Sequence, residues 1–76
     1  MSNFTKSQVK TAESIISATV NASADPYDAE NRLKVLSNLC KQTNGINLPK
    51  KVKICVANMI DLAIMKGGII DAAKNA

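Results

Sequence analysis

The sequence predicts an all-α fold: a small bundle of three main helices over about residues 5–23, 26–43 and 48–66, with a short C-terminal helix over about 69–75. Apolar side chains recur every three or four positions, as on one face of a helix, and strand-like alternation is missing. Start and stop signals of helices separate the apolar segments. The chain has 76 residues, which suits one domain, so we expect residues 1–76 to form a single helical domain.

The first helix is predicted from the start signal at its N-terminal end. Thr5 and Gln8 have the spacing of a capping box, in which each side chain accepts a hydrogen bond from the other residue's backbone amide. Phe4 and Val9 stand at the positions of a hydrophobic staple. The residues that follow form one apolar arc and one polar arc. We therefore expect an amphipathic helix with a single buried face.

The second helix should begin at Asp25-Pro26, which also ends the first. Proline suits the first helical position but disfavours helical geometry in the residue before it, where aspartate is a good cap. Its expected buried stripe consists of Ala29, Leu33, Leu36 and Cys40, widened by Val35 and Leu39. We expect Asn44-Gly45 to stop it through a left-handed residue. The short connections predict that consecutive helices pack as antiparallel neighbours.

The third segment is apolar around most of its circumference. Asn47 should cap it, with Pro49 in its first turn. We expect no membrane span, because the apolar run is shorter than the ~20 residues that a bilayer requires and contains Asp61. Gly67-Gly68 should end this helix, and the segment beyond could form the short C-terminal helix or fray.

One stripe of the third helix is a candidate interface, because a helical wheel places two large apolar residues among polar ones. The stripe consists of Ile54, Asn58, Asp61 and Met65. A three-helix domain seldom covers a helix from every side, so we expect self-association or partner binding here. In the alternative, this is the central core helix and the two apolar residues are simply exposed. Tyr27, on the polar side of the second helix, is a further interface candidate or else a half-buried tyrosine.

Positive charge is unevenly distributed in this chain of formal net charge +4, since no acidic residue occurs from Arg32 to Ile60. Arg32 and Lys34 each follow an acid by four residues, which predicts surface ion pairs. The remaining candidates for binding an anionic partner are Lys41, Lys50, Lys51 and Lys53. Lysines and free amides at a helix start suit phosphate, a nucleic-acid backbone or an acidic protein. The alternative is a solvated basic loop.

Catalytic and metal-binding patterns are missing from the sequence. It has no histidine, no close pair of carboxylates and no cysteine spacing typical of zinc. We therefore expect no enzymatic activity, no metal and no other cofactor. The N-terminal segment lacks the apolar stretch of a signal peptide, so we expect a cytoplasmic protein. Cys40 and Cys55 should then be buried, reduced thiols.

These observations favour a protein–protein interaction module, such as a regulator, inhibitor or adaptor, that works as a homo-oligomer. Its size and its lysine- and asparagine-rich composition also suit a phage or mobile-element accessory protein acting on a host target. One alternative is a sequence-tolerant nucleic-acid binder that uses the stretch from Arg32 to Lys53. Another is a binder of a small anionic ligand at the start of the third helix. A base-reading helix-turn-helix is disfavoured, because the third helix is mostly aliphatic.

Overall fold

A computed structural model describes residues 4–67, which contain three helices and no strand. Helix α1 spans Lys6–Asn21, α2 spans Pro26–Lys41 and α3 spans Lys50–Met65. The all-α prediction is confirmed for these residues, and each helix is shorter than predicted at one or both ends. The expected C-terminal helix over about 69–75 lies outside the described residues. Within the described residues, no helix is both long enough and apolar enough to cross a membrane.

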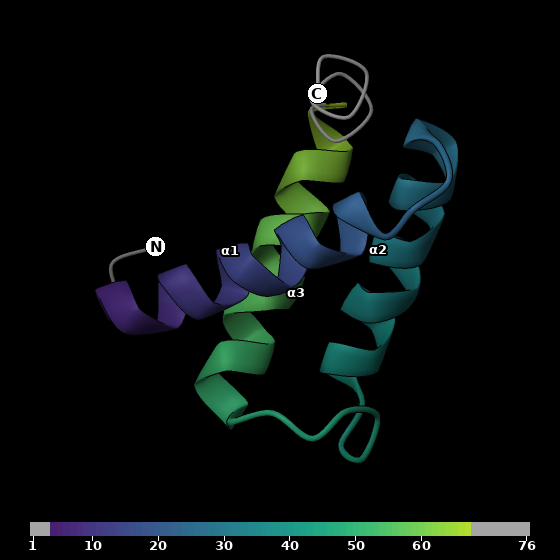
Figure 1. Cartoon of the computed structure of the whole chain (residues 1–76). Helices are drawn as coiled ribbons and strands as arrows, with labels where there is room; N and C mark the ends of the chain where they lie inside the picture. The colour runs from purple at the N-terminus through teal and green to yellow at the C-terminus, as the bar shows by residue number, and fades with distance from the viewer. Residues whose placement is uncertain (1–3, 68–76) are drawn as a thin grey trace.

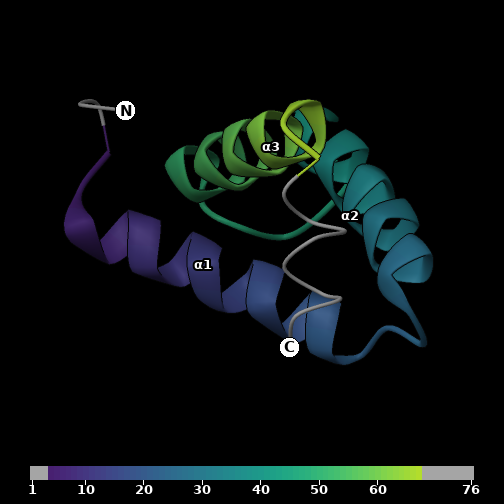
Figure 2. The same ribbon diagram turned by 90° about the horizontal axis from the view of Figure 1, so that it is seen from above.

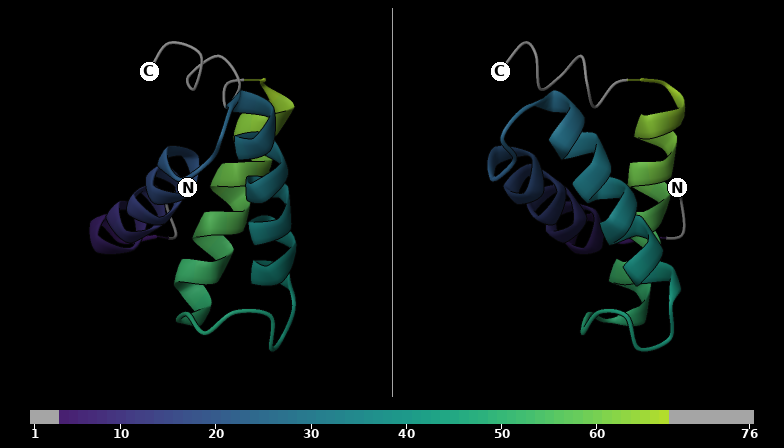
Figure 3. Two further views of the ribbon diagram at one scale, coloured as in Figure 1. Left: turned by 45° about the vertical axis from the view of Figure 1, so that its right-hand side comes forward. Right: turned by 90° about the vertical axis from the view of Figure 1, so that its right-hand side faces the viewer.

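Helices α2 and α3 run antiparallel and side by side, joined by the connection over residues 42–49 (Figure 1). Helix α1 crosses this pair obliquely on one side, as the view from above and the two side views show (Figures 2 and 3). The antiparallel prediction therefore holds for α2 and α3 but is wrong for α1 and α2. The backbone of Asp25 is extended between α1 and α2, which redirects the chain before α2 begins.

The start signals of the first two helices are confirmed. The Gln8 amide donates to Thr5 Oγ1 at 3.1 Å, and the Thr5 amide donates to Gln8 Oε1 at 2.9 Å. At the start of α2, the Asp28 amide donates to Asp25 Oδ1 at 2.8 Å, with Pro26 in the first turn. These side chains satisfy amides that have no partner inside the helix, so local sequence alone defines where both helices begin.

The connection between α2 and α3 differs from the prediction at two positions. Gly45 does not adopt a left-handed conformation; among the described residues only Gly67, just after α3, has a positive φ, of 70°. A Cβ atom on Gly45 would lie 2.3 Å from the carbonyl oxygen of Leu39, so glycine is required there by close packing. Asn47 does not cap α3, because the helix begins after Pro49 and has no side-chain cap.

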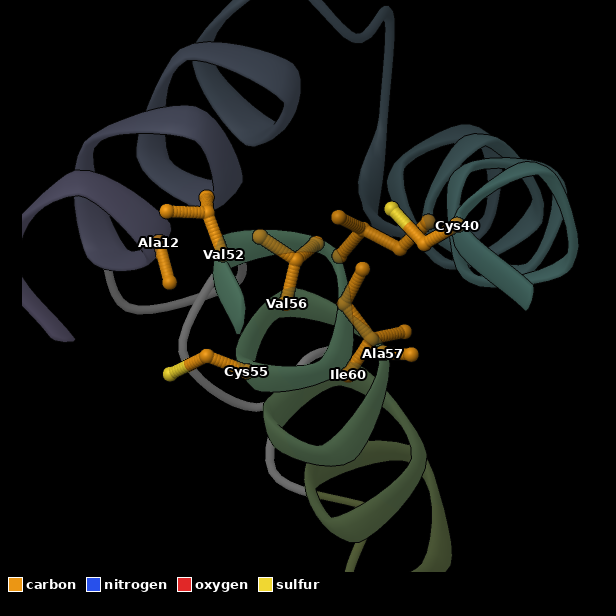
Figure 4. Close-up of a cluster of buried hydrophobic side chains, with 8 residues drawn as sticks. Ala12, Cys40, Val52, Cys55, Val56, Ala57 and Ile60 are labelled. Carbon is orange, nitrogen blue, oxygen red and sulfur yellow. The ribbon is translucent and has the colours of Figure 1, made fainter. Parts of the chain in front are cut away.

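The core lies where α3 meets the other two helices, and α3 supplies most of it. Its buried residues are Val52, Cys55, Val56, Ala57 and Ile60 from α3, Ala12 from α1, and Leu33 and Cys40 from α2. Figure 4 shows Cys40 on α2 and Cys55 on α3 with their sulfur atoms well apart, and both are free thiols. The interpretation of α3 as a central helix is therefore confirmed.

Two large apolar residues of α2 and α3 have much of their surface exposed. Val35 was assigned to the buried stripe of α2, but 53% of its surface is exposed. Leu62 lies in the mostly apolar third segment, and 41% of its surface is exposed. The oblique path of α1 explains the exposure of Val35, because it leaves an open groove there, lined by Val35, by Ala18 of α1 and by Ala22, which follows α1.

Candidate functional site

An open groove lies between the C-terminal end of α2 and the first half of α3, and we call it the α2–α3 groove. Its volume is about 540 Å³, within the range of small binding sites. Cys40 and Ala57, which are buried, and Ile54, which is 39% exposed, supply its apolar surface. The remaining lining residues are polar or basic: Lys41, Gln42, Thr43, Lys50, Lys53 and Asn58. No residue of α1 lines this groove.

The groove combines residues that the sequence suggested for two separate roles. Ile54 and Asn58 belong to the predicted interface stripe, whereas Lys50 and Lys53 belong to the predicted anion-binding set. Their spacing of three and four residues places them on one face of α3. Lys41 joins them because it is the last residue of α2, which runs antiparallel to α3. The result is an apolar surface bordered by three lysines.

Among residues 4–67, the lysines of α3 have no acidic side chain within ion-pair distance. Within residues 4–67, the ion pairs are Arg32 with Asp28 at 3.0 Å, Lys34 with Glu30 at 3.9 Å, and Lys41 with Asp61 at 2.6 Å. The first two confirm the predicted pairs between residues four apart. The first turn of α3 contains no acidic residue. Lys50 and Lys53 therefore present positive charge to the groove, at the helix end where the dipole already favours anions.

A polar cluster ties α2 to α3 next to the groove. The hydroxyl of Ser37 donates to Asp61 Oδ1 at 2.7 Å, and Lys41 Nζ lies 2.6 Å from Asp61 Oδ2. Ser37 is 2% exposed, so its hydroxyl cannot reach a substrate in solution, and the hydrogen bond satisfies a buried polar group. Asp61, predicted to face a partner, is instead engaged with α2. Lys41, predicted to bind an external anion, shares its charge with Asp61.

The cluster should make stability depend on pH. Hydrogen bonds from Lys41 and then Ser37 hold the pKa of the Asp61 carboxyl below its ordinary value of 3.8. The unfolded chain then binds this proton more readily than the folded chain, so the stabilisation is full above the unfolded pKa and is lost as pH falls through the lower folded pKa. The effect should be modest, since the side chains of Lys41 and Asp61 are 53% and 46% exposed.

We expect Asp61→Asn to lower the free energy of unfolding at about pH 6 and to reduce its decrease between about pH 6 and pH 3, because asparagine does not titrate there. Urea denaturation of both proteins at the two pH values measures this. The pKa of Asp28 is also lowered, chiefly by a hydrogen bond from the Ala24 amide, but Asp28 is present in both proteins. Equal pH dependence of the two proteins would contradict the role of Asp61.

The other predicted site residues lie outside the groove. Met65 is 76% exposed near the C-terminal end of α3, and Tyr27 is 65% exposed at the start of α2. Lys51 is exposed but does not line the α2–α3 groove. The four residues of the predicted interface stripe therefore do not form one free surface: two line the groove, Asp61 contacts α2, and Met65 faces solvent.

Sequence analysis missed several residues of this region. Cys40 was assigned only to the buried stripe of the second helix and Ala57 was given no role, yet both line the groove. Gln42 and Thr43 were placed at the end of the second helix and given no role, but they follow α2 and border the groove. A helical wheel of one helix could not find them, because the groove exists only where two helices lie side by side.

The thiols do not form a reactive centre. Burial raises the pKa of Cys40, which Lys53 partly opposes, and burial also raises the pKa of Cys55. A raised pKa disfavours the thiolate, which is the nucleophilic form. Within the described residues, no group of three or more histidine, cysteine, aspartate or glutamate side chains is arranged to hold a metal ion.

The fold and the site define a three-helix bundle that carries a groove with apolar and basic surfaces. Comparison of the chain with protein-family models, curated proteins and solved structures finds no match. The functional argument therefore rests on the groove itself.

Proposed function

We propose that this chain is a non-enzymatic protein–protein interaction module that binds a partner segment in the α2–α3 groove. The observation that supports this proposal is the exposed part of Ile54 beside the buried Ala57 and Cys40. An apolar side chain of a partner would gain free energy by leaving water there, and the surrounding polar groups would orient it. Regulators, inhibitors and adaptors all act through such surfaces. The proposed location is the cytoplasm, where both thiols would stay reduced.

A protein partner suits this groove better than nucleic acid. Phosphate backbones are bound by cationic and hydrogen-bonding groups, and an apolar surface contributes little to such binding. Single-strand binding also needs aromatic side chains on which bases stack, and the groove is lined by none. Tyr27, the only tyrosine, lies elsewhere on α2.

The test is a selection of peptides from a random display library against the protein, followed by measurement of their affinity for Ile54→Glu. Glutamate at this position places a charge on the apolar surface of the groove, so we expect affinity to fall at least about tenfold for most selected peptides. Lys51→Glu is the matched control, because it adds glutamate to an exposed position of α3 outside the groove, and it should change affinity less. Selected peptides that bind Ile54→Glu and the original protein equally would exclude the groove as the docking site.

Self-association is the second part of the proposal. Leu62 and Met65 are exposed on the C-terminal half of α3, where a second copy could cover them. We expect light scattering to give a multiple of the monomer mass, and Leu62→Glu combined with Met65→Glu to give the monomer mass with unchanged helical circular dichroism. Lys10→Glu combined with Lys66→Glu, at exposed positions, controls for the added negative charge. A monomeric original protein would rule out self-association and leave the groove proposal intact.

A further inference from the structure

We infer that the partner segment in the α2–α3 groove is acidic and amphipathic, with an apolar side chain that contacts Ile54 and Ala57 and carboxylates that reach Lys50 and Lys53. This inference rests on the proposed function and names the chemistry of its partner. Neither lysine has a carboxylate within ion-pair distance in the part of the chain that the structure describes. A bound acidic segment would supply that missing charge next to the apolar contact.

The positions of the lysines set the geometry of the partner. Lys50 lies one helical turn before Ile54, and Lys53 directly precedes Ile54 in the sequence. Both lysines line the groove together with Ile54, so positive charge borders the apolar surface. Lys41 borders the groove from α2 and already contacts Asp61. A partner with carboxylates three or four residues from an apolar anchor, on one face of a helix, matches this pattern.

A second copy of this chain does not supply such a segment from its described residues. Of the acids there, Asp28, Glu30 and Asp61 are already in ion pairs, and Asp25 caps α2. The remaining acid, Glu13, is a single exposed carboxylate on α1. One carboxylate does not complement a basic groove, so charge complementarity favours a different protein as the partner.

The apolar surface of the groove also favours an acidic amphipathic segment over a polyanion as the partner. Lys51 follows Lys50 directly but does not line the groove, so the lysines do not form one continuous basic track. The affinity for a phosphate backbone would come from all exposed lysines and would not depend on the apolar residues. The affinity for an acidic amphipathic segment would depend on Ile54 as well as on Lys50 and Lys53.

The experiment compares synthetic peptides by nuclear magnetic resonance titration of the isotope-labelled protein up to millimolar concentration. The acidic peptide has leucine anchors with glutamates three or four residues from them on the same helical face. A neutral peptide carries glutamine in place of glutamate, and an acidic peptide without anchors carries alanine in place of leucine. A short single-stranded DNA oligonucleotide represents the polyanion. We expect the acidic amphipathic peptide to shift the signals of Ile54, Ala57 and Asn58 and to bind about tenfold more tightly than each of the other three.

Lys50→Glu combined with Lys53→Glu should remove most of the advantage of the acidic peptide over the neutral one, while Lys6→Glu combined with Lys51→Glu should preserve it. Equal binding of acidic and neutral peptides in the groove would overturn the acidic partner but keep the proposed function. The DNA oligonucleotide or the alanine peptide could bind at least as tightly as the acidic amphipathic peptide. The groove would then be a simple anion site without an apolar anchor, and the inference would be overturned. If no peptide shifts the groove signals, the proposed function fails along with the inference.

Discussion

Replacing Ile60 by alanine should lower the free energy of unfolding by about 2–5 kcal/mol, the usual cost of removing a large aliphatic side chain from a core. Ile60 is fully buried and belongs to the core cluster in which α3 meets the other helices. Domains of this size seldom have more than about 3–5 kcal/mol of stability, so a large part of the protein should be unfolded at room temperature. Urea denaturation followed by circular dichroism at 222 nm measures the change.

Val35→Ala is the matched control, because it also shortens an aliphatic side chain in a helix but at an exposed position. Its effect should remain within about 0.5 kcal/mol. If Ile60→Ala is too unstable for its unfolding curve to be fitted, Ile60→Val is measured in its place. It should lower the free energy of unfolding by about 0.5–1.5 kcal/mol. An effect of Ile60→Ala no larger than that of Val35→Ala would show that α3 is not the central helix.

Replacing Ala12 by leucine should lower the free energy of unfolding by about 1–3 kcal/mol, because the larger side chain does not fit a closely packed site. Ala12 is fully buried, with an exposed fraction of 0%, and it is the only buried residue of α1. A methyl group at this position lets α1 lie close to α3 where the two helices cross. Leucine would push α1 outward and expose the part of the core beneath it.

Ser14→Leu provides the control for this second prediction. It adds the same leucine to an exposed position of the same helix, so the change in unfolding free energy should stay within about 0.5 kcal/mol. Signals from α1 and from the facing side of α3 should shift in the Ala12→Leu spectrum, while those of the α2–α3 groove should change little, since no residue of α1 lines it. Equal stability of the two leucine variants would show that α1 does not pack closely on α3.

The packing that holds α2 against α3 also forms the groove. Both walls of the groove come from the α2–α3 pair, and that pair is held by the buried residues of α3 and by the contacts of Asp61 with Ser37 and Lys41. A variant that loses this packing should therefore lose peptide binding together with its helical signal. Variants of the lysines should lose binding alone. This contrast separates residues that build the groove from residues that contact the partner.

Sequence by itself determined the helices, because their signals act over a few residues. The capping pair of Thr5 and Gln8, the Asp25-Pro26 start and the glycine at 67 each satisfy or interrupt hydrogen bonds within one turn. The wide apolar circumference of the third segment indicated either an interface or a central core helix, and the structure shows that α3 supplies most of the core. The predicted role of Gly45 was wrong, because it depends on packing between residues and not on a helix signal. Glycine is required there by the nearby carbonyl group of Leu39, which leaves no room for a side chain.

The tertiary structure alone decided which exposed residues share a surface. The wheel of α3 placed Ile54, Asn58, Asp61 and Met65 on one stripe, but only the antiparallel position of α2 shows that Asp61 is bound to Ser37 and Lys41. The same packing brings Lys41 and Cys40 to the face of α3 that carries Lys50, Lys53 and Ile54. Periodicity reports the faces of one helix, whereas a groove depends on the distance and angle between two helices, which long-range packing determines.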